Sequence, residues 1–312
     1  MTTLPQTLPA EATSSRNRAL ALVMDYAELM KARVTSLVMM SAWCGYYLAA
    51  INMGVPRVSW TMFHAVMGIG VVAGGTAAMN QLIERKIDVF MKRTARRPLP
   101  MGRMSALHAA MIGVVTIAGG LAYLAVTTNW MTALLTAATS AVYLGAYTPL
   151  KRKSPVCTFI GAFPGAMPAV LGWAAVKPSL GWEPLVLFAI MFLWQFPHFH
   201  SIAWLYREDY ERAGIRMLPV VHSDGRSTAR EIIAYSLLLI PVSLAPTWLH
   251  MSGRVYLVGA LALGVAFYAF GHRLATLKLA ATEARSKAPA RHLLQASVFY
   301  LPLLFALMMI NA

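Results

Sequence analysis

The sequence predicts an all-α polytopic membrane protein with nine transmembrane helices and a cytoplasmic N-terminus. Hydrophobic residues make up 58% of its 312 residues and charged residues only 12%, which is far from the average of a water-soluble domain. Several apolar runs are close to 20 residues long, the length that crosses a bilayer as an α-helix. The basic residues fall mainly in alternate connections between these runs, as they do in membrane proteins.

The nine expected spans follow one another with short connections. Their approximate limits are 34–52, 61–83, 104–126, 130–147, 156–176, 184–204, 230–249, 254–275 and 293–311. If the N-terminus is inside, every lysine and arginine except Arg57, Lys177 and Arg254 lies in or beside an inside segment. The net charge of +15 therefore indicates membrane topology and attraction to anionic lipid rather than binding of nucleic acid.

The predicted organisation is a cytoplasmic N-terminal tail, 1–33, followed by a single transmembrane bundle, 34–312. We expect the first 18 residues to be disordered, and no apolar core of a signal peptide precedes Arg16. Two polar connections, about 84–103 and 205–229, are long enough to be functional, and the topology places both on the cytoplasmic side. A bacterial inner membrane is favoured over a mitochondrial one.

The first polar connection begins with three oxygen-bearing side chains at helical spacing. Asn80, Glu84 and Asp88 are four residues apart, so on a continuing helix they share one face over roughly 12 Å. Oxygen ligands of this kind suit Mg²⁺. The alternative is a helix end emerging into water, with its acids paired to nearby arginines.

A dense cationic cluster follows: Lys92, Arg93, Arg96 and Arg97. Guanidinium groups match the geometry of phosphate, so acids followed by arginines indicate a site for a metal diphosphate at the membrane surface. Arg93 and Arg97 would share a helical face if the helix continued that far.

The end of the sixth span carries Gln195, His198 and His200. A histidine within a membrane span is a functional candidate because polar groups are costly there. The two histidines are two residues apart and point in different directions on a helix, so at most one is expected to face a cavity, and His198 is favoured. The alternative is a histidine at headgroup level bonded to backbone or water.

The second polar connection and the short loop after the fourth span supply further candidates. Asp209 is either part of a solvated charged loop or a second carboxylate for metal or substrate. Lys151, Arg152 and Lys153 are first of all topology anchors, with a secondary role in steering a diphosphate.

Four segments resemble the UbiA superfamily of intramembrane prenyltransferases, and within it the branch that farnesylates haem. They are N-x-x-x-E-x-x-x-D-x-x-M-x-R-T-x-x-R-P-L from Asn80 to Leu99, Y-T-P-L-K-R from Tyr147 to Arg152, W-Q-x-P-H-F from Trp194 to Phe199, and D-Y-x-x-A-G-I-x-M-L-P-V from Asp209 to Val220. The resemblance covers nearly the whole chain from about Glu28. The motif that begins at Asp209 has no clear aspartate four residues before it. The haem-type members share this departure from the wider superfamily.

The resemblance implies helices around a central cavity, substrate-bridging Mg²⁺, farnesyl diphosphate as donor and haem B as acceptor, with water addition giving haem O. Metal would be held by Asn80, Glu84 and Asp88, with Asp209 as a further ligand. Arg93, Arg96 and Arg97, assisted by Lys151 and Arg152, would neutralise the diphosphate, and His198 would orient haem.

Other interpretations stay open at this point. Another prenyltransferase of the same superfamily, acting on a quinone or chlorophyll precursor, is the nearest. A transporter or channel would also have an acid-lined cavity, although coupling residues then usually lie near the midplane. A structural assembly subunit would leave the Asn80–Asp88 spacing unexplained. Besides contact with membrane lipids, the resemblance implies a haem A synthase or a terminal oxidase as candidate partners.

Overall fold

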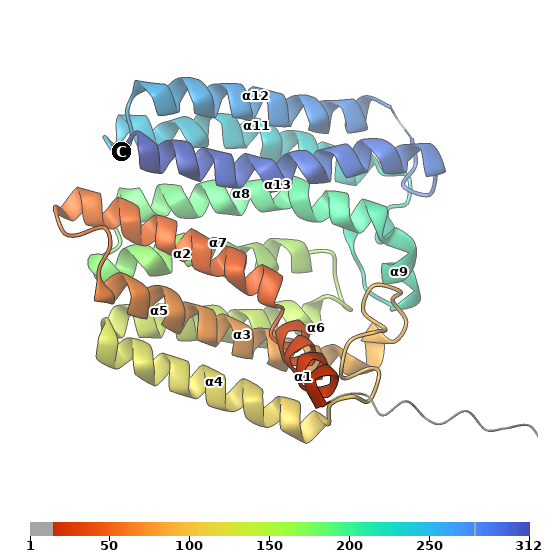
Figure 1. Cartoon of the computed structure of the whole chain (residues 1–312). Coiled ribbons are helices and arrows are strands. Elements are labelled where there is room, and N and C mark those ends of the chain that lie inside the picture. The colour runs from red at the N-terminus through yellow and green to blue at the C-terminus, as the bar shows by residue number, and fades with distance from the viewer. Residues whose placement is uncertain (1–14, 278) are drawn as a thin grey trace, which may run out of the picture.

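The computed structural model describes residues 15–277 and 279–312, and these residues form helices and turns and no strand (Figure 1). The helices are α1 (Ser15–Leu29), α2 (Ala32–Met53), α3 (Trp60–Asp88), α4 (Ala106–Thr127), α5 (Trp130–Val142), the π-helix η1 (Tyr143–Tyr147), α6 (Thr148–Leu150), α7 (Cys157–Val176), α8 (Trp182–Leu205), α9 (Arg207–Arg212), α10 (Leu218–Val221), α11 (Arg226–Trp248), α12 (Arg254–Thr276), the 3₁₀-helix η2 (Ala284–Ser286) and α13 (Lys287–Ile310).

Eight helices in the described part of the chain are long and apolar enough to cross a membrane. They are α2, α3, α4, α7, α8, α11, α12 and the continuous η2–α13 segment. The expected fourth span, 130–147, differs because α5 gives way at Val142 to the π-helical turn η1, after which α6 follows. The count of nine spans therefore remains a prediction. π-Helical turns are often found at functional sites, and η1 ends at Tyr147, the first residue of the Y-T-P-L-K-R segment.

The helices pack closely where glycine removes a side chain. α2 and α7 touch at Gly45 and Gly172, where an added Cβ would lie 1.8 Å from a backbone oxygen of the other helix in each case. Gly75 on α3 plays the same part against Thr116 of α4, where the Cβ would come within 2.2 Å of the hydroxyl. Small residues at helix contacts are the usual means of close packing between membrane helices.

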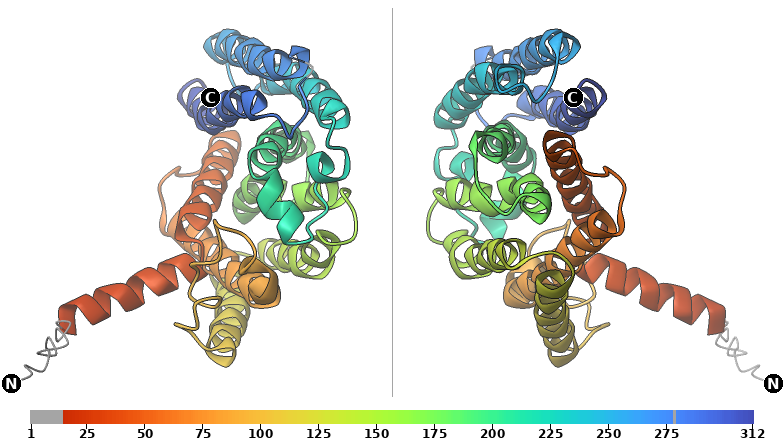
Figure 2. Two further views of the ribbon diagram at one scale, coloured as in Figure 1. Left: turned by 90° about the vertical axis from the view of Figure 1, so that its right-hand side faces the viewer. Right: turned by 90° about the vertical axis from the view of Figure 1, so that its left-hand side faces the viewer.

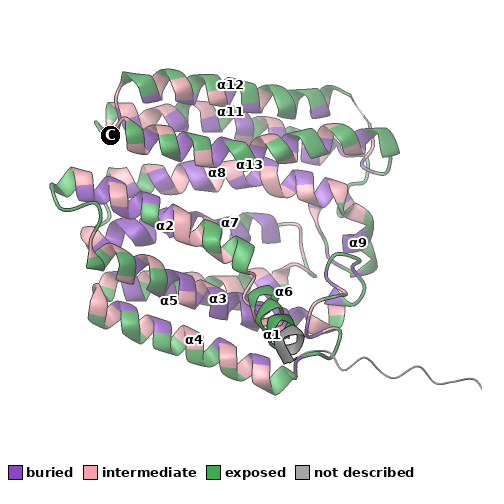
Figure 3. Cartoon of the chain, viewed as in Figure 1, coloured by how far each residue is buried: buried purple, intermediate pink, exposed green. Residues whose placement is uncertain are grey.

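The distribution of burial matches a bundle surrounded by lipid (Figure 3). Central helices such as α7 and α8 bury large side chains, including Trp173 and Phe196. The outward faces of α4 and α12 expose apolar residues, among them Val115 and Val258, each 68% exposed. An apolar outer face of this kind is stable in hydrocarbon and not in water.

The polar connections gather at one end of the bundle, on the right in Figure 1, with α1, α6 and α9. α1 projects from that end (Figure 2). The expectation of a disordered tail over the first 18 residues is wrong from Ser15 onward, since α1 begins there; residues 1–14 lie outside the described part. Gln81 on α3 donates to the carbonyls of Glu28 and Leu29 at 2.7 and 2.9 Å, which fixes the end of α1 against α3.

Candidate functional site

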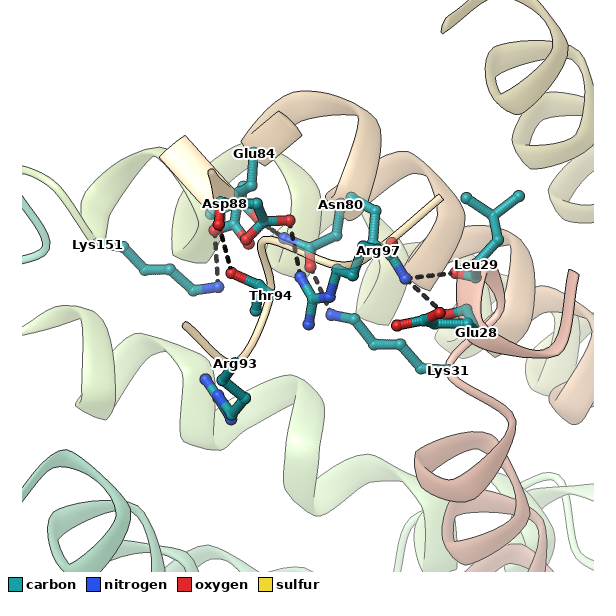
Figure 4. A network of polar contacts seen from close by, with 12 residues as sticks. Glu28, Leu29, Lys31, Asn80, Glu84, Asp88, Arg93, Thr94, Arg97 and Lys151 are labelled. Atoms are coloured by element: carbon teal, nitrogen blue, oxygen red, sulfur yellow. Dashed lines mark hydrogen bonds and ion pairs between the residues drawn. The ribbon is translucent and has the colours of Figure 1, made fainter. Parts of the chain in front are cut away.

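The face of α3 that carries Asn80, Glu84 and Asp88 is turned into the protein. The helix continues through Asp88, as the spacing requires, and the three residues are 0, 7 and 0% exposed. Figure 4 shows their side chains in a row, with basic side chains from other elements beside them. The interpretation of these residues as a helix end emerging into water is therefore wrong, although each one does have a cationic neighbour.

Asn80 is held between Lys31 and Thr148. The Lys31 ammonium donates to Asn80 Oδ1 at 2.7 Å, and Asn80 Nδ2 donates to the Thr148 hydroxyl at 3.1 Å. Lys31 forms the turn between α1 and α2 with a left-handed backbone (φ 47°), which is uncommon for a residue with a side chain. Burial lowers the pKa of Lys31. The sequence alone does not single out Lys31, because a lysine just before the first span is indistinguishable from a topology anchor.

Glu84 pairs with Lys151, whose ammonium lies 2.8 Å from Glu84 Oε1 and over the ring of Tyr147, 4.5 Å from its centroid. Burial acts to lower the pKa of Lys151, but the interactions with Tyr147 and the Glu84 carboxylate outweigh it and raise that pKa. Lys151 thus contacts one of the candidate residues on α3, which its expected use as a topology anchor does not require. Its neighbour Arg152 is exposed, and no hydrogen bond or ion pair joins its side chain to the described residues.

Asp88 lies at the last position of α3. Its Oδ2 accepts from Arg97 Nη1 at 2.8 Å, and the Thr94 hydroxyl donates to its backbone carbonyl at 2.8 Å. Its other oxygen, Oδ1, is fully enclosed and has no hydrogen-bond partner among the described residues. A buried carboxylate oxygen without a donor is costly, which makes this position a candidate for a ligand.

The arginines of the first polar connection do not share a helical face. α3 ends at Asp88, where the Thr94 hydroxyl takes the carbonyl that a further helical turn would have used, and 89–104 form turns. Arg97 folds back to Asp88, whereas Arg93 reaches Tyr210 (3.2 Å to its hydroxyl). The side chain of Arg96 is exposed.

The second polar connection packs against the first. Besides the Arg93–Tyr210 contact, Arg212 donates to the carbonyl of Phe90 at 3.3 Å. Asp209 on α9 is 9% exposed and forms an ion pair with Arg212. The structure therefore brings the two connections together, but Asp209 is joined to Arg212 and not to the α3 carboxylates.

The side chains of the sixth span separate as their spacing predicts. His198 Nδ1 lies 2.8 Å from Ser297 Oγ of α13, and His200 Nε2 lies 2.7 Å from Glu231 Oε2 of α11. Gln195 donates to the carbonyl of Ala162 on α7 at 3.2 Å. His200 is buried and its ring is engaged by a carboxylate, while His198 is only partly buried. The three residues contact three different helices.

The side chains on α3 fit a magnesium ion that is shared with a substrate phosphate. The described residues contain no cluster of three or more histidine, cysteine, aspartate or glutamate side chains that would hold a metal alone. Mg²⁺, however, is usually bound by one or two carboxylates together with substrate phosphates. Glu84 and the unpartnered oxygen of Asp88 provide the carboxylates, and the ammonium and guanidinium groups of Lys31, Lys151 and Arg97 provide positive charge for an anion.

The chain is similar to known proteins over most of its length. The family model described as "UbiA prenyltransferase family" matches residues 38–307. A protoheme IX farnesyltransferase of Koribacter versatilis is 58% identical over 291 residues, which cover 93% of this chain and 94% of that protein. A protein of the same name from Solibacter usitatus is 49% identical over 298 residues, covering 92% and 98%.

Solved structures share the fold. The structure reported for digeranylgeranylglyceryl phosphate synthase aligns with a TM-score of 0.73 at 16% identity, over 93% of this chain and 98% of that one. A UbiA homologue from Archaeoglobus fulgidus, bound to GPP and Mg²⁺, aligns with a TM-score of 0.58 at 17% identity, over 91% and 99%. At these identities the likeness concerns the arrangement of helices.

Proposed function

This chain belongs to the UbiA prenyltransferase family, and on that premise we propose that it transfers farnesyl from farnesyl diphosphate to a vinyl group of haem B, with addition of water, to give haem O. The observation that carries the choice of acceptor is the identity of 58% with a protoheme IX farnesyltransferase along nearly the whole of both chains. The observation that carries the chemistry is the row of buried oxygens on α3 with cations beside it (Figure 4).

The diphosphate of the donor is proposed to lie between the α3 oxygens and the basic side chains. Asn80, Glu84 and Asp88 would hold Mg²⁺, with Asp209 as a further candidate ligand from α9. A bound Mg²⁺ supplies positive charge to the diphosphate leaving group. The enclosed Oδ1 of Asp88, which has no donor among the described residues, supports its inclusion among these ligands.

Basic residues of this chain stabilise the leaving group as the carbon–oxygen bond of farnesyl breaks and its electron pair passes to the diphosphate. Lys31, Lys151 and Arg97 already contact the three α3 side chains, so their charges are in position before the substrate binds. Arg93 lies at the contact between the two polar connections. The side chains of Arg96 and Arg152, in the loops that follow α3 and α6, are exposed. These last two are proposed to attract the anionic substrate rather than to touch the reacting atoms.

The allylic cation left on farnesyl is attacked by the electron pair of a haem vinyl group, which forms the new carbon–carbon bond. The cation that remains beside the porphyrin takes the oxygen of water, and one proton is lost, which gives a hydroxyethylfarnesyl substituent. The apolar interior of the bundle excludes water from the first cation. His198 is proposed to orient haem.

The end of the bundle that carries the site is proposed to face the cytoplasm of a bacterial cell, with the chain in the inner membrane. This orientation puts the strongly basic connections inside, as the positive-inside rule requires. The product is lipophilic and stays in the membrane, so a haem A synthase or a terminal oxidase is the proposed recipient.

The acceptor is tested by incubating the purified protein in lipid nanodiscs with labelled farnesyl diphosphate, Mg²⁺ and one acceptor at a time. Haem B is expected to become farnesylated, while 4-hydroxybenzoate and chlorophyllide are not. Labelling of a quinone or chlorophyll precursor in place of haem would contradict the proposed acceptor and leave the prenyltransferase assignment intact.

A further inference from the structure

His198 of α8 contacts Ser297 of α13 and Trp194 of its own helix, and these two residues also contact each other. It lies seven residues before Leu205, the end of α8 nearest the polar connections, and so about 10 Å inside the bundle. Its Nδ1 is 2.8 Å from Ser297 Oγ on α13. Trp194, one turn earlier on α8, donates from its indole nitrogen to the backbone carbonyl of the same serine at 2.9 Å. Its ring also stacks on the imidazole, with centroids 4.8 Å apart and planes at 19°.

The serine determines which imidazole nitrogen carries the proton. Ser297 Oγ donates its single hydrogen to the carbonyl of Leu294 at 2.6 Å, so it can only accept from His198. His198 Nδ1 must therefore be the protonated nitrogen. In a neutral imidazole the other nitrogen, Nε2, then has a free lone pair.

His198 Nε2 is available for a ligand. It has no hydrogen-bond partner in the described part of the chain, and it is not among the unpartnered polar atoms that are fully enclosed. The corresponding nitrogen of His200 is already engaged, because its Nε2 lies 2.7 Å from Glu231 Oε2, and its side chain is only 2% exposed. The stacking on Trp194 and the bond to Ser297 hold the His198 ring in one orientation.

We propose that His198 binds the iron of the haem acceptor through Nε2, and that Ser297 and Trp194 are positioning residues for this ligand. The inference rests on the proposed function, since it takes haem as the acceptor. A histidine that ligates metal through one nitrogen commonly donates its other N–H to an oxygen, as here. A haem propionate would instead need a proton on Nε2, and hence a cationic imidazolium within a membrane-spanning helix, where charge is costly.

The test compares haem B with metal-free protoporphyrin IX, which keeps the vinyl and propionate groups and lacks iron. Both are titrated into the purified full-length protein in nanodiscs, haem by its Soret absorption and protoporphyrin by its fluorescence. His198→Ala is expected to weaken haem binding by at least tenfold and to leave protoporphyrin binding unchanged. His292→Ala, which removes an exposed histidine of α13, is the matched control and should alter neither.

Spectra of the haem complexes separate a ligand from a packing contact. His198→Gly should lose the signature of histidine ligation and regain it when imidazole is added. Ser297→Ala should weaken haem binding by roughly tenfold, whereas Ser297→Thr, which keeps the hydroxyl, should not. Equal losses of haem and protoporphyrin binding in His198→Ala, or no loss of either, would overturn the proposal. A wild-type protein that binds no haem would overturn it together with the proposed function, whereas haem binding that survives in His198→Ala would overturn the inference alone.

Discussion

Asp88→Asn removes one negative charge from the site and keeps the size of the side chain. Asp88 is 1% exposed in its side chain and contacts Arg97, which is 17% exposed, at 2.8 Å. Loss of the charge leaves the guanidinium without an anionic partner, but the amide oxygen can still accept from it and water can reach it, so we expect a loss of stability of only about 1–2 kcal/mol. The effect on turnover should be larger, because Asp88 Oδ1 has no donor among the described residues and the substitution removes a carboxylate proposed to hold the metal.

We expect farnesylation of haem by Asp88→Asn to fall at least hundredfold, which corresponds to about 2.7 kcal/mol in the barrier. The assay follows labelled farnesyl transfer in nanodiscs over a range of Mg²⁺ concentrations. Asp25→Asn is the matched control, since it makes the same change at an ion pair with Arg103 that is partly open to water. Its activity should equal that of the wild type. Wild-type turnover in Asp88→Asn, with the protein folded and inserted, would refute the assignment of Asp88 as a metal ligand.

Three further outcomes follow from other parts of the structure. Burial lowers the pKa of Lys31 from its usual value of 10.5, so turnover should decline with rising pH as this ammonium loses its proton. Lys31→Arg should move that decline to higher pH, because arginine keeps its charge. An alkaline limb of the pH–rate profile that does not move would show that Lys31 is not the titrating group. Tyr210→Phe removes the hydroxyl that accepts from Arg93 at 3.2 Å. We expect transition-state stabilisation to fall by about 1 kcal/mol, which is roughly fivefold in kcat/KM in the farnesyl-transfer assay. An unchanged kcat/KM would mean that the contact between the two polar connections does not support turnover. Gly172→Ala should lower the free energy of unfolding by about 1–3 kcal/mol in a thermal-unfolding assay, because its Cβ would lie 1.8 Å from a backbone oxygen. Gly119→Ala, where a Cβ would meet no atom within 4 Å, should leave stability unchanged. Equal unfolding temperatures for the two variants would contradict the close packing of α2 and α7.

The class of fold and the placement of the three candidate residues on one helix face were predictable because they depend on regular spacing. Apolar length predicted the membrane helices, and the four-residue spacing placed Asn80, Glu84 and Asp88 on one buried face of α3. The separation of His198 from His200 followed from the same helical geometry. Each of these features depends on residues within one helix.

What the sequence did not predict depends on contacts between elements. The role of Lys31 arises from the left-handed turn that brings the end of α1 against α3, and nothing in its neighbours along the chain distinguishes it from an anchor. The end of α3 at Asp88, which separates Arg93 from Arg97, depends on the Thr94 hydroxyl. The pairing of Lys151 with Glu84 joins residues that are 67 positions apart.

The most direct test of the site is the binding of Mn²⁺, a paramagnetic substitute for Mg²⁺, measured by electron paramagnetic resonance with a non-hydrolysable analogue of farnesyl diphosphate. The wild-type protein and Asp25→Asn should bind Mn²⁺ tightly only when the analogue is present, because the ion needs oxygens from both protein and diphosphate. Asp88→Asn should lose this binding. Tight Mn²⁺ binding that is the same in Asp88→Asn as in the wild type would contradict the account.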